Sequence, residues 1–375
     1  MNTTLLNVKL PQPEAIKYQV NIGTELIKKI PSLLGTLTPV ARYIIITDTM
    51  MNNIYGTAII NIFKKADLQA DIITFPAGEK NKTEATHRKL THKMLQKKCG
   101  RDTMIIALGG GVVGDTAGYV AATYMRGIPY INIPTSFLAM VDSSIGGKVG
   151  VDTKFGKNLI GAFWHPEAVI VDIDYLKKLP QTQLVNGLME SIKIFLTYNK
   201  EMLEMVENNW KKVLKKDLSL LQKIIARSIE LKIGVVTRDE HEANERMVVN
   251  WGHTIGHAIE HLSNFSFGHG YCVGYGILVE SKIAELMGVL SIEDFEKVCE
   301  MMHGFGITKK ALKDILKKFS IQAIVKQTLI DKKARNGKVK YVLLEKIGSV
   351  KTTKGMFGHE IDKNMVKKAL TYFTK

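Results

Sequence analysis

Glycine residues at a fingerprint spacing are the first feature of the sequence that could do chemistry. In DTMIIALGGGVVGDTAGYVAATYM, Gly109, Gly111 and Gly114 stand in G-x-G-x-x-G register, directly after an apolar run and directly before a helix-forming run. Glycines in this context let backbone N–H groups approach a pyrophosphate at a helix N-terminus, which predicts dinucleotide binding. Asp115 follows at once and the motif lies far from the N-terminus, so we expect an unusual arrangement of such a site. A plain tight turn is the alternative interpretation.

A loop-rich segment downstream gathers residue types that bind phosphate and hydroxyl groups. The stretch NIPTSFLAMVDSSIGGKVGVDTKFGKN lies between two strand-like runs and is dense in Gly, Ser and Lys. Such loops suit anions, although each residue taken alone is also what a turn requires. Because these loops follow the glycine fingerprint, we predict a ligand cleft. Its candidate residues are Thr135, Ser136, Asp142, Gly146, Gly147, Lys148, Lys157 and Asn158.

Histidines at a spacing that suits a metal ion occur in VVNWGHTIGHAIEHLSNFSFGHGYC. His253 and His257 are four residues apart on an expected helix, so their imidazoles share one face, and His269 follows in a glycine-flanked loop. Two or three imidazoles with a carboxylate suit Zn²⁺ or a similar ion, although a histidine pair at this spacing is often a surface feature. The carboxylate could be Glu190, one turn from Lys193 in LMESIK, but spacing alone leaves this assignment open.

The elements that must position these residues divide the chain into two parts. From Leu5 to about Leu179, the runs ARYIIITD, ADIITF, DTMIIAL, PYINIP and EAVIVDID alternate with helix-period segments, which predicts a mostly parallel α/β sheet. After Pro180, long helical patterns take over, with one late hairpin candidate around Ile347 and Gly348. We therefore expect an α/β domain over residues 1–180 and a mainly α-helical domain over residues 181–375.

The composition is basic and otherwise ordinary. The 375 residues include 52 Lys and Arg against 36 Asp and Glu, a net charge of +16, scattered along the chain. This pattern indicates a solvated surface, part of which could line a cleft for an anionic substrate, and no nucleic-acid partner is expected. Three separate cysteines without C-x-x-C spacing favour a reducing cytoplasm. Neither an export signal nor a membrane span is expected, because the N-terminus and the longest apolar runs do not fit either pattern.

Taken together, these motifs resemble the 3-dehydroquinate synthase family. The resemblance runs from about Gly78 to Gly348 and is carried by GGGVVGDTAGYVAATYMRGIPYINIPTS, VDSSIGGKVGVDTKFGKNLIGAF, GLMESIK, NWGHTIGHAIEH, HG and DKKARNGKVKYVLL, in this order. It implies an N-terminal α/β Rossmann-like NAD-binding domain, an all-α C-terminal domain, an active site in the cleft between them and a homodimer.

The resemblance also implies a role for each matching residue. A divalent metal, Zn or Co, would be held by Glu190, His253 and His269, with His257 hydrogen-bonding beside them. Contacts with NAD are expected at Asp48, Gly78, Glu79, Lys80, Lys82, Gly111, Val112, Val113, Gly114, Asp115, Thr135, Ser136, Asp142, Lys148, Lys157 and Leu176. Contacts with the carboxylate and phosphate of the substrate are expected at Arg126, Lys148, Asn158, Lys193, Lys232, Arg246, Asn250 and one of Lys332 and Lys333, with Lys333 taken as the contact.

The implied reaction converts 3-deoxy-D-arabino-heptulosonate 7-phosphate to 3-dehydroquinate and phosphate in the shikimate pathway to aromatic amino acids. NAD⁺ would be used transiently and regenerated within one turnover. Rival enzyme functions are another sugar phosphate cyclase, such as 2-deoxy-scyllo-inosose synthase, and an iron- or zinc-dependent alcohol or polyol dehydrogenase that releases NADH. Asp115, the intact VDSSIGGK and Arg246 favour the dehydroquinate interpretation over the other cyclase.

Two positions depart from the family pattern. The usual HGE reads HGY at His269, Gly270 and Tyr271, and the usual glycine-rich run before Arg246 reads EHEANER. Neither change removes an expected ligand. Tyr271 nevertheless places an unusual side chain next to an expected metal ligand, where neighbouring groups tune metal binding.

Overall fold

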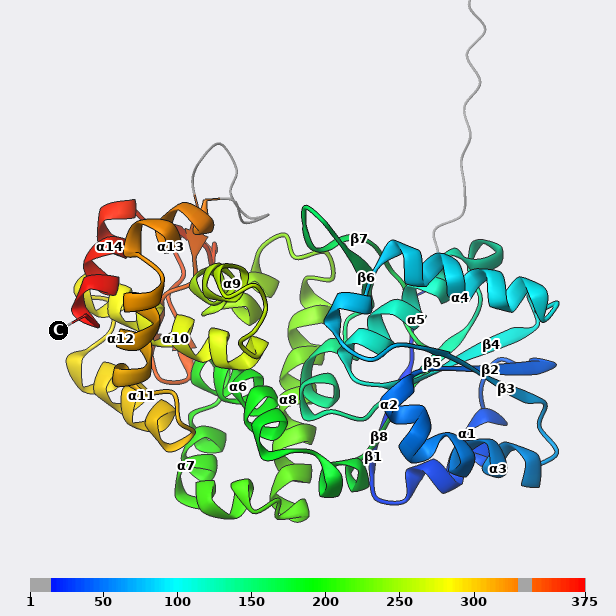
Figure 1. Ribbon diagram of the computed structural model, residues 1–375. Coiled ribbons are helices and arrows are strands. Elements are labelled where there is room, and N and C mark those ends of the chain that lie inside the picture. Colours follow the sequence, from blue (N-terminus) through cyan, green and yellow to red (C-terminus); the bar gives the residue numbers. More distant parts are fainter. Residues whose placement is uncertain (1–14, 330–338, 375) are drawn as a thin grey trace, which may run out of the picture.

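A parallel sheet forms the N-terminal part of the molecule. The computed structural model describes residues 15–329 and 339–374 (Figure 1). Six strands lie in the order β1-β8-β5-β4-β2-β3, and each neighbouring pair is parallel. The α/β prediction is confirmed. The strands are β1 (Gln19–Gly23), β2 (Arg42–Asp48), β3 (Ala70–Phe75), β4 (Thr103–Gly109), β5 (Tyr130–Pro134) and β8 (Ala168–Asp172).

Helices cover both faces of this sheet, which explains why its central strands are almost uninterrupted apolar runs. In β2, Ile45 belongs to the core cluster that contains Ile59. The neighbouring Ile44 and Ile46 point the other way, into the cluster that contains Leu90. The covering helices are α1 (Ile30–Leu34) and α3 (Thr57–Lys65) on one face, and α4 (Glu84–Gln96) and α5 (Gly111–Thr123) on the other.

Helices make up most of the chain after Pro180, as the sequence predicted. Their core is continuous with one face of the sheet, because a single buried cluster contains both Ile133 of β5 and Leu188 of α6. The helices are α6 (Gln181–Tyr198), α7 (Lys200–Leu214), α8 (Leu218–Arg238), α9 (His253–Leu262), α10 (His269–Leu286), α11 (Ile292–Gly304), α12 (Lys309–Lys318), α13 (Ile321–Thr328) and α14 (Lys363–Tyr372). Short turns of helix occur as α2 (Thr49–Met51), η1 (Leu26–Lys29), η2 (Asn52–Gly56), η3 (Glu79–Asn81), η4 (Tyr124–Arg126), η5 (Ala139–Ser143), η6 (Ile173–Lys178) and η7 (Glu245–Asn250).

Two short strand pairs lie within the helical part. β10 (Leu344–Lys346) and β11 (Ser349–Val350) pair antiparallel around Gly348, so the hairpin expected there is confirmed. β9 (Lys340–Tyr341) pairs with β12 (His359–Glu360), which the sequence did not predict. Strands of two residues are too short to show an alternating pattern.

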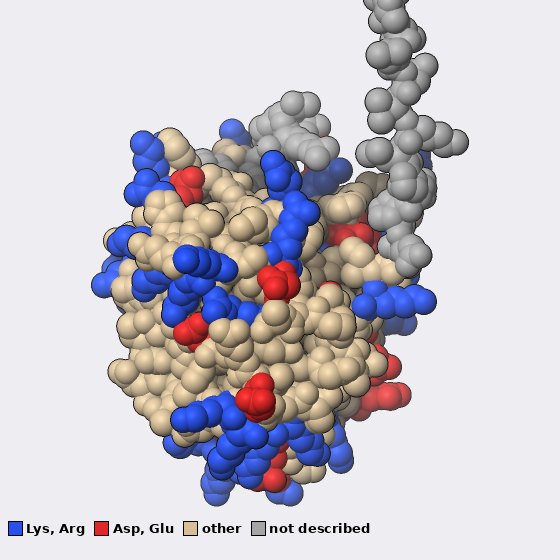
Figure 2. Space-filling model, turned by 90° about the vertical axis from the view of Figure 1, so that its right-hand side faces the viewer, with Lys and Arg blue, Asp and Glu red and all other residues tan. Residues whose placement is uncertain are grey.

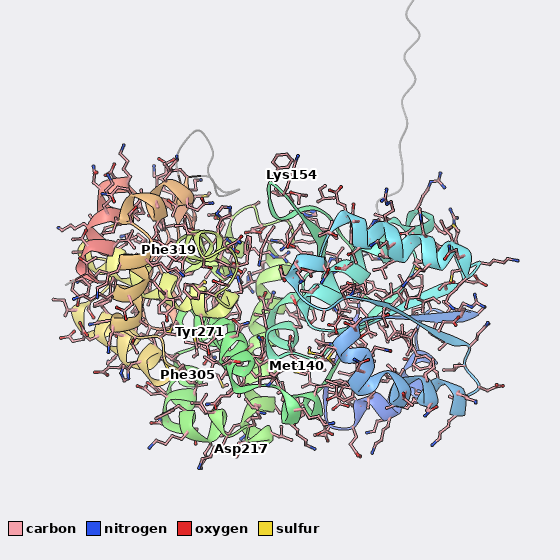
Figure 3. All side chains as sticks on the ribbon, in the orientation of Figure 1. Met140, Lys154, Asp217, Tyr271, Phe305 and Phe319 are labelled. Atoms are coloured by element: carbon pink, nitrogen blue, oxygen red, sulfur yellow. The ribbon has the colours of Figure 1, made fainter. Side chains whose placement is uncertain are left out.

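An antiparallel hairpin occupies part of the segment that was expected to be loop. It consists of β6 (Lys148–Thr153) and β7 (Gly156–Phe163), with Lys154 at its tip (Figure 3). Gly150 and Gly161 face each other across it, and a Cβ on Gly161 would lie 2.1 Å from the carbonyl oxygen of Val149. Glycine permits this close approach, and the same glycines weakened the strand pattern in the sequence.

The surface is basic without one dominant patch on the face that Figure 2 shows. Lys and Arg side chains form several groups there, with Asp and Glu between them. This distribution agrees with the scattered lysines of the sequence. Among the described residues, the helices are either too short or too polar to cross a membrane.

Glycines bring α9 and α10 into close contact. A Cβ on Gly276 of α10 would lie 1.8 Å from the carbonyl oxygen of Gly252, which directly precedes α9. In addition, the buried Glu280 of α10 accepts a hydrogen bond of 2.8 Å from the N–H of Gly252. The start of α9, where His253 lies, is therefore fixed against α10.

Replacement of Gly276 by Ala should destabilise the fold, because its methyl group would force the two helices apart. We expect the free energy of unfolding to fall by about 1–3 kcal/mol, measured by urea denaturation. Gly304→Ala at the end of α11 is the matched control, since a Cβ there meets no atom within 4 Å. Equal stability of the two variants would contradict the close packing described for Gly276.

Candidate active site

The residues predicted to bind the dinucleotide meet at the carboxyl edge of the sheet. Asp48 ends β2, Gly109 ends β4, and Thr135 follows β5, with its N–H donating a 2.9 Å hydrogen bond to the Gly109 carbonyl. After β3 the chain returns past β2 to form β4 on the other side. Ligands of open parallel sheets bind at such a reversal of strand order, beyond the carboxyl ends of the strands.

The glycine fingerprint forms the turn between β4 and α5, as predicted. A Cβ on Gly111 would lie 3.1 Å from Ser143 Oγ, and one on Gly114 would lie 3.0 Å from Asn132 Nδ2. The absent side chains leave the N-terminal N–H groups of α5 approachable, which is the geometry that binds a pyrophosphate. Val113 and Leu176, two of the predicted cofactor contacts, are fully buried.

A buried lysine ties the glycine turn to the β6–β7 hairpin. Lys82 Nζ pairs with Asp115 and donates to Asn158 Oδ1 at 2.5 Å. Burial alone would lower the pKa of Lys82, but the carboxylates of Asp115 and Glu79 raise it above its usual value. Lys82 therefore stays charged. Four residues predicted to contact cofactor or substrate thus lie together, namely Glu79, Lys82, Asp115 and Asn158. The remaining cofactor candidates nearby are Gly78, with φ 102°, and Lys80, which is exposed.

Cationic residues of the helical part reach the loop before β6. Lys232 of α8 donates to the Asp142 carbonyl oxygen at 2.5 Å and to Asp142 Oδ1 at 2.6 Å. Burial alone would raise the pKa of Asp142, but Lys232 and Lys193 lower it below its usual value. Arg246 donates from Nη2 to the Gly146 carbonyl oxygen at 3.1 Å. These contacts bring residues from both parts of the chain to one place.

Glu190, His253 and His269 form a donor set of the kind that holds a divalent metal. Glu190 Oε1 lies 3.7 Å from His253 Nε2 and 3.6 Å from His269 Nε2. Ligand atoms of a tetrahedral site with bonds of about 2.1 Å are separated by roughly 3.4 Å, so the spacing fits an ion. Glu190 Oε1 is buried and has no hydrogen-bond partner among the described residues, whereas the other oxygen pairs with Lys193. A cation would satisfy this oxygen.

His257 offers a second donor set that shares two members with the first. Nitrogen atoms of His253, His257 and His269 all lie within 4.8 Å of one another. We propose the set that contains the carboxylate, because an ion there would also satisfy the unpartnered Oε1 of Glu190. Nδ1 of His253 is 3.2 Å from the Trp251 carbonyl oxygen, which leaves Nε2 as the ligand atom. His261 is exposed.

Two acidic residues of the site were not predicted from the sequence. Glu242 contacts both Lys148 and Asn250 through its carboxylate. Glu260 is buried and contacts both Lys157 and His269. The sequence held a weak indication of Glu260, because it lies three residues after His257 and so shares the histidine face of α9. Glu242 gave no such indication, since its contacts depend on the folded loop.

The remaining residues predicted to contact the substrate are Arg126 and Lys333. Arg126 is exposed and ends η4, the short turn that follows α5. Lys333 and its alternative Lys332 lie outside the described residues. Tyr271, the unusual neighbour of His269, is partly buried against the hydrophobic core on the helical side of the molecule (Figure 3).

Models of a known family match most of the chain. Models of the N-terminal and C-terminal parts of 3-dehydroquinate synthase match residues 72–186 and 187–334. The 3-dehydroquinate synthase of Thermodesulfovibrio yellowstonii is 39% identical over 320 residues, covering 85% of this chain and 88% of the relative.

Solved structures of sugar phosphate cyclases share the fold. A 2-deoxy-scyllo-inosose synthase complexed with carbaglucose-6-phosphate, NAD⁺ and Co²⁺ is 27% identical, with a TM-score of 0.85 and coverage of 94% of this chain and 96% of that one. The 2-epi-5-epi-valiolone synthase of Streptomyces hygroscopicus subsp. jinggangensis, with NAD⁺ and Zn²⁺ bound, is 22% identical at a TM-score of 0.87, covering 98% and 99%. The higher identity lies with the dehydroquinate enzymes, and the chain belongs to the 3-dehydroquinate synthase family.

Proposed function

We propose that this chain converts 3-deoxy-D-arabino-heptulosonate 7-phosphate to 3-dehydroquinate and phosphate, in the shikimate pathway to aromatic amino acids. The observation that carries the proposal is the buried donor set of Glu190, His253 and His269, set beside cationic side chains in a member of this family. A substrate with a carboxylate and a phosphate needs such cations. Those available are Lys148, Lys193, Lys232 and Arg246, with the amides of Asn158 and Asn250.

The proposed chemistry divides between two bound groups and the chain itself. NAD⁺, when bound, would take a hydride from the substrate alcohol and return it within the same turnover. A divalent ion, Zn or Co, when bound, would lower the pKa of substrate hydroxyls as a Lewis acid. The ketone formed by oxidation acidifies the neighbouring C–H bond, so phosphate can leave by elimination, which makes the enzyme a carbon–oxygen lyase.

The protein side chains would bind the metal ion, orient the substrate and neutralise the charge of its phosphate. Glu190, His253 and His269 would hold the ion, while His257 would hydrogen-bond a substrate hydroxyl beside it. Lys193 lies next to Glu190 and, with Lys232, would balance the charge of the departing phosphate.

We propose the same organisation for the whole molecule as for the family. An NAD-binding domain would cover residues 1–180 and a metal- and substrate-binding domain residues 181–375, with the reaction in the cleft between them. The fact that α6 begins at Gln181 supports this boundary. A cytoplasmic homodimer completes the proposal, and light scattering after size exclusion tests the dimer.

NAD⁺ should be required only in catalytic amounts. With protein freed of nucleotide, a small quantity of added NAD⁺ should support release of many equivalents of phosphate from the heptulosonate phosphate, and a chelator should abolish that release. NADH should not accumulate, because the same molecule is oxidised and reduced. NADH formed in proportion to substrate consumed would instead indicate a polyol dehydrogenase.

Gly114→Val should weaken NAD⁺ binding by at least about tenfold, or roughly 1.4 kcal/mol. The added side chain would meet Asn132, which already lies 3.0 Å from the position of a Cβ, and would crowd the start of α5. Calorimetric titration with NAD⁺ measures the change. Gly304→Val, remote from the glycine turn, is the control and should bind NAD⁺ normally. Normal affinity in a folded Gly114→Val protein would refute the placement of the pyrophosphate.

Replacement of the three proposed ligands should remove the metal. Glu190→Ala, His253→Ala and His269→Ala should each lose bound metal, measured by elemental analysis, and nearly all phosphate release, while the circular dichroism spectrum stays native. His257→Ala should keep its metal and lose activity. His261→Ala should behave as the wild type, because His261 is exposed. Metal retained in His269→Ala but lost in His257→Ala would overturn the assignment.

A further inference from the structure

One buried carboxylate contacts both the proposed metal site and the proposed cofactor site. Glu260 of α9 is 3% exposed. Its Oε2 lies 3.2 Å from His269 Nδ1, and its Oε1 accepts a hydrogen bond from Lys157 Nζ at 2.9 Å. The two oxygens of the same group therefore have two different partners, each from a different predicted site.

The contact with His269 selects which nitrogen can bind a metal. A deprotonated carboxylate only accepts hydrogen bonds, so Nδ1 of His269 must carry the proton. Nε2 is then left with its lone pair, and this is the atom that lies 3.6 Å from Glu190 Oε1. Carboxylates that hold a ligating histidine in this way orient the ring and increase its basicity.

The contact with Lys157 reaches across the molecule. Lys157 lies in β7, in the N-terminal half, whereas Glu260 and His269 lie in α9 and α10. Lys157 Nζ is also 3.2 Å from Glu79 Oε1 and 4.6 Å from the centre of the Phe265 ring. The lysine is therefore held between a carboxylate of each half, and loss of Glu260 would remove the contact with the helical half.

We propose that Glu260 is a positioning residue that couples metal binding to NAD⁺ binding. This inference rests on the proposed function for the identity of the two ligands. A metal bound through His269 fixes the ring against Glu260, which in turn holds Lys157 in place for the dinucleotide. By thermodynamic reciprocity, each ligand should increase affinity for the other by the same factor.

Glu260→Gln is the variant that tests the coupling. Lys157 and His269 approach different oxygens of Glu260, so in Gln one of them would face an NH₂ group, which only donates, and that contact would be lost. We expect metal-free protein of this variant to bind Co²⁺ about 10–100-fold more weakly than the wild type, measured by the visible absorption of Co²⁺. Its NAD⁺ affinity should no longer depend on whether Co²⁺ is present, measured by calorimetric titration.

Glu79→Gln is the matched control, because Glu79 contacts Lys157, whereas the carboxylate beside His269 Nδ1 is that of Glu260. It should change NAD⁺ affinity and leave Co²⁺ affinity at the wild-type value. If Glu260→Gln does not fold, Lys157→Met replaces it, and this variant should keep Co²⁺ affinity within a few-fold while losing the dependence of NAD⁺ binding on metal.

The outcomes separate this inference from the proposed function. Wild-type protein that binds neither Co²⁺ nor NAD⁺ would overturn both. Wild-type protein that binds both ligands, together with a folded Glu260→Gln variant of unchanged Co²⁺ affinity, would overturn only the role of Glu260. Equal Co²⁺ losses in Glu79→Gln and Glu260→Gln would also overturn it, because they would reflect a general charge effect.

Discussion

The site depends on a carboxylate that is buried away from water, so hydration does not stabilise its charge. Glu190 is 3% exposed, and one of its oxygens has no hydrogen-bond partner among the described residues. Burying a charge without partners costs free energy, and Lys193 pairs with Oε2 of Glu190 but not with Oε1. The two imidazoles at 3.6 and 3.7 Å complete a set of negative and electron-donating atoms that a divalent cation would bind.

The fold supplies the rigidity that such an arrangement requires. Glu190 lies in the middle of α6, where residues 184 to 197 are all buried. His253 and His269 each begin a helix, and the glycine contacts between α9 and α10 fix these starting points relative to each other. Lys82 holds the turn before α5 against the β6–β7 hairpin. Lys232 of α8 pairs with Asp142 and so joins the segment after β5 to the helical part. Ligand atoms placed on such elements move little when substrate arrives.

The sequence predicted the parts of the structure that depend on local pattern. The glycine turn, the long helices and the Gly348 hairpin all follow from residue types within a few positions of one another. The metal set could not be derived this way, because Glu190 and His253 are 63 residues apart and only packing brings them together. Glu242 was missed for the same reason, whereas Glu260 carried a weak local indication beside His257. The β6–β7 hairpin was taken for loop because its glycines hide the alternation. Resemblance to the family supplied the long-range contacts that spacing could not.

The measurement that tests the account most directly is the position of the metal itself. Anomalous X-ray diffraction from crystals grown with Co²⁺ locates the ion without reference to activity. The account predicts one strong peak about 2.0–2.2 Å from Glu190 Oε1, His253 Nε2 and His269 Nε2. A peak bound by His257 and remote from Glu190 would contradict it.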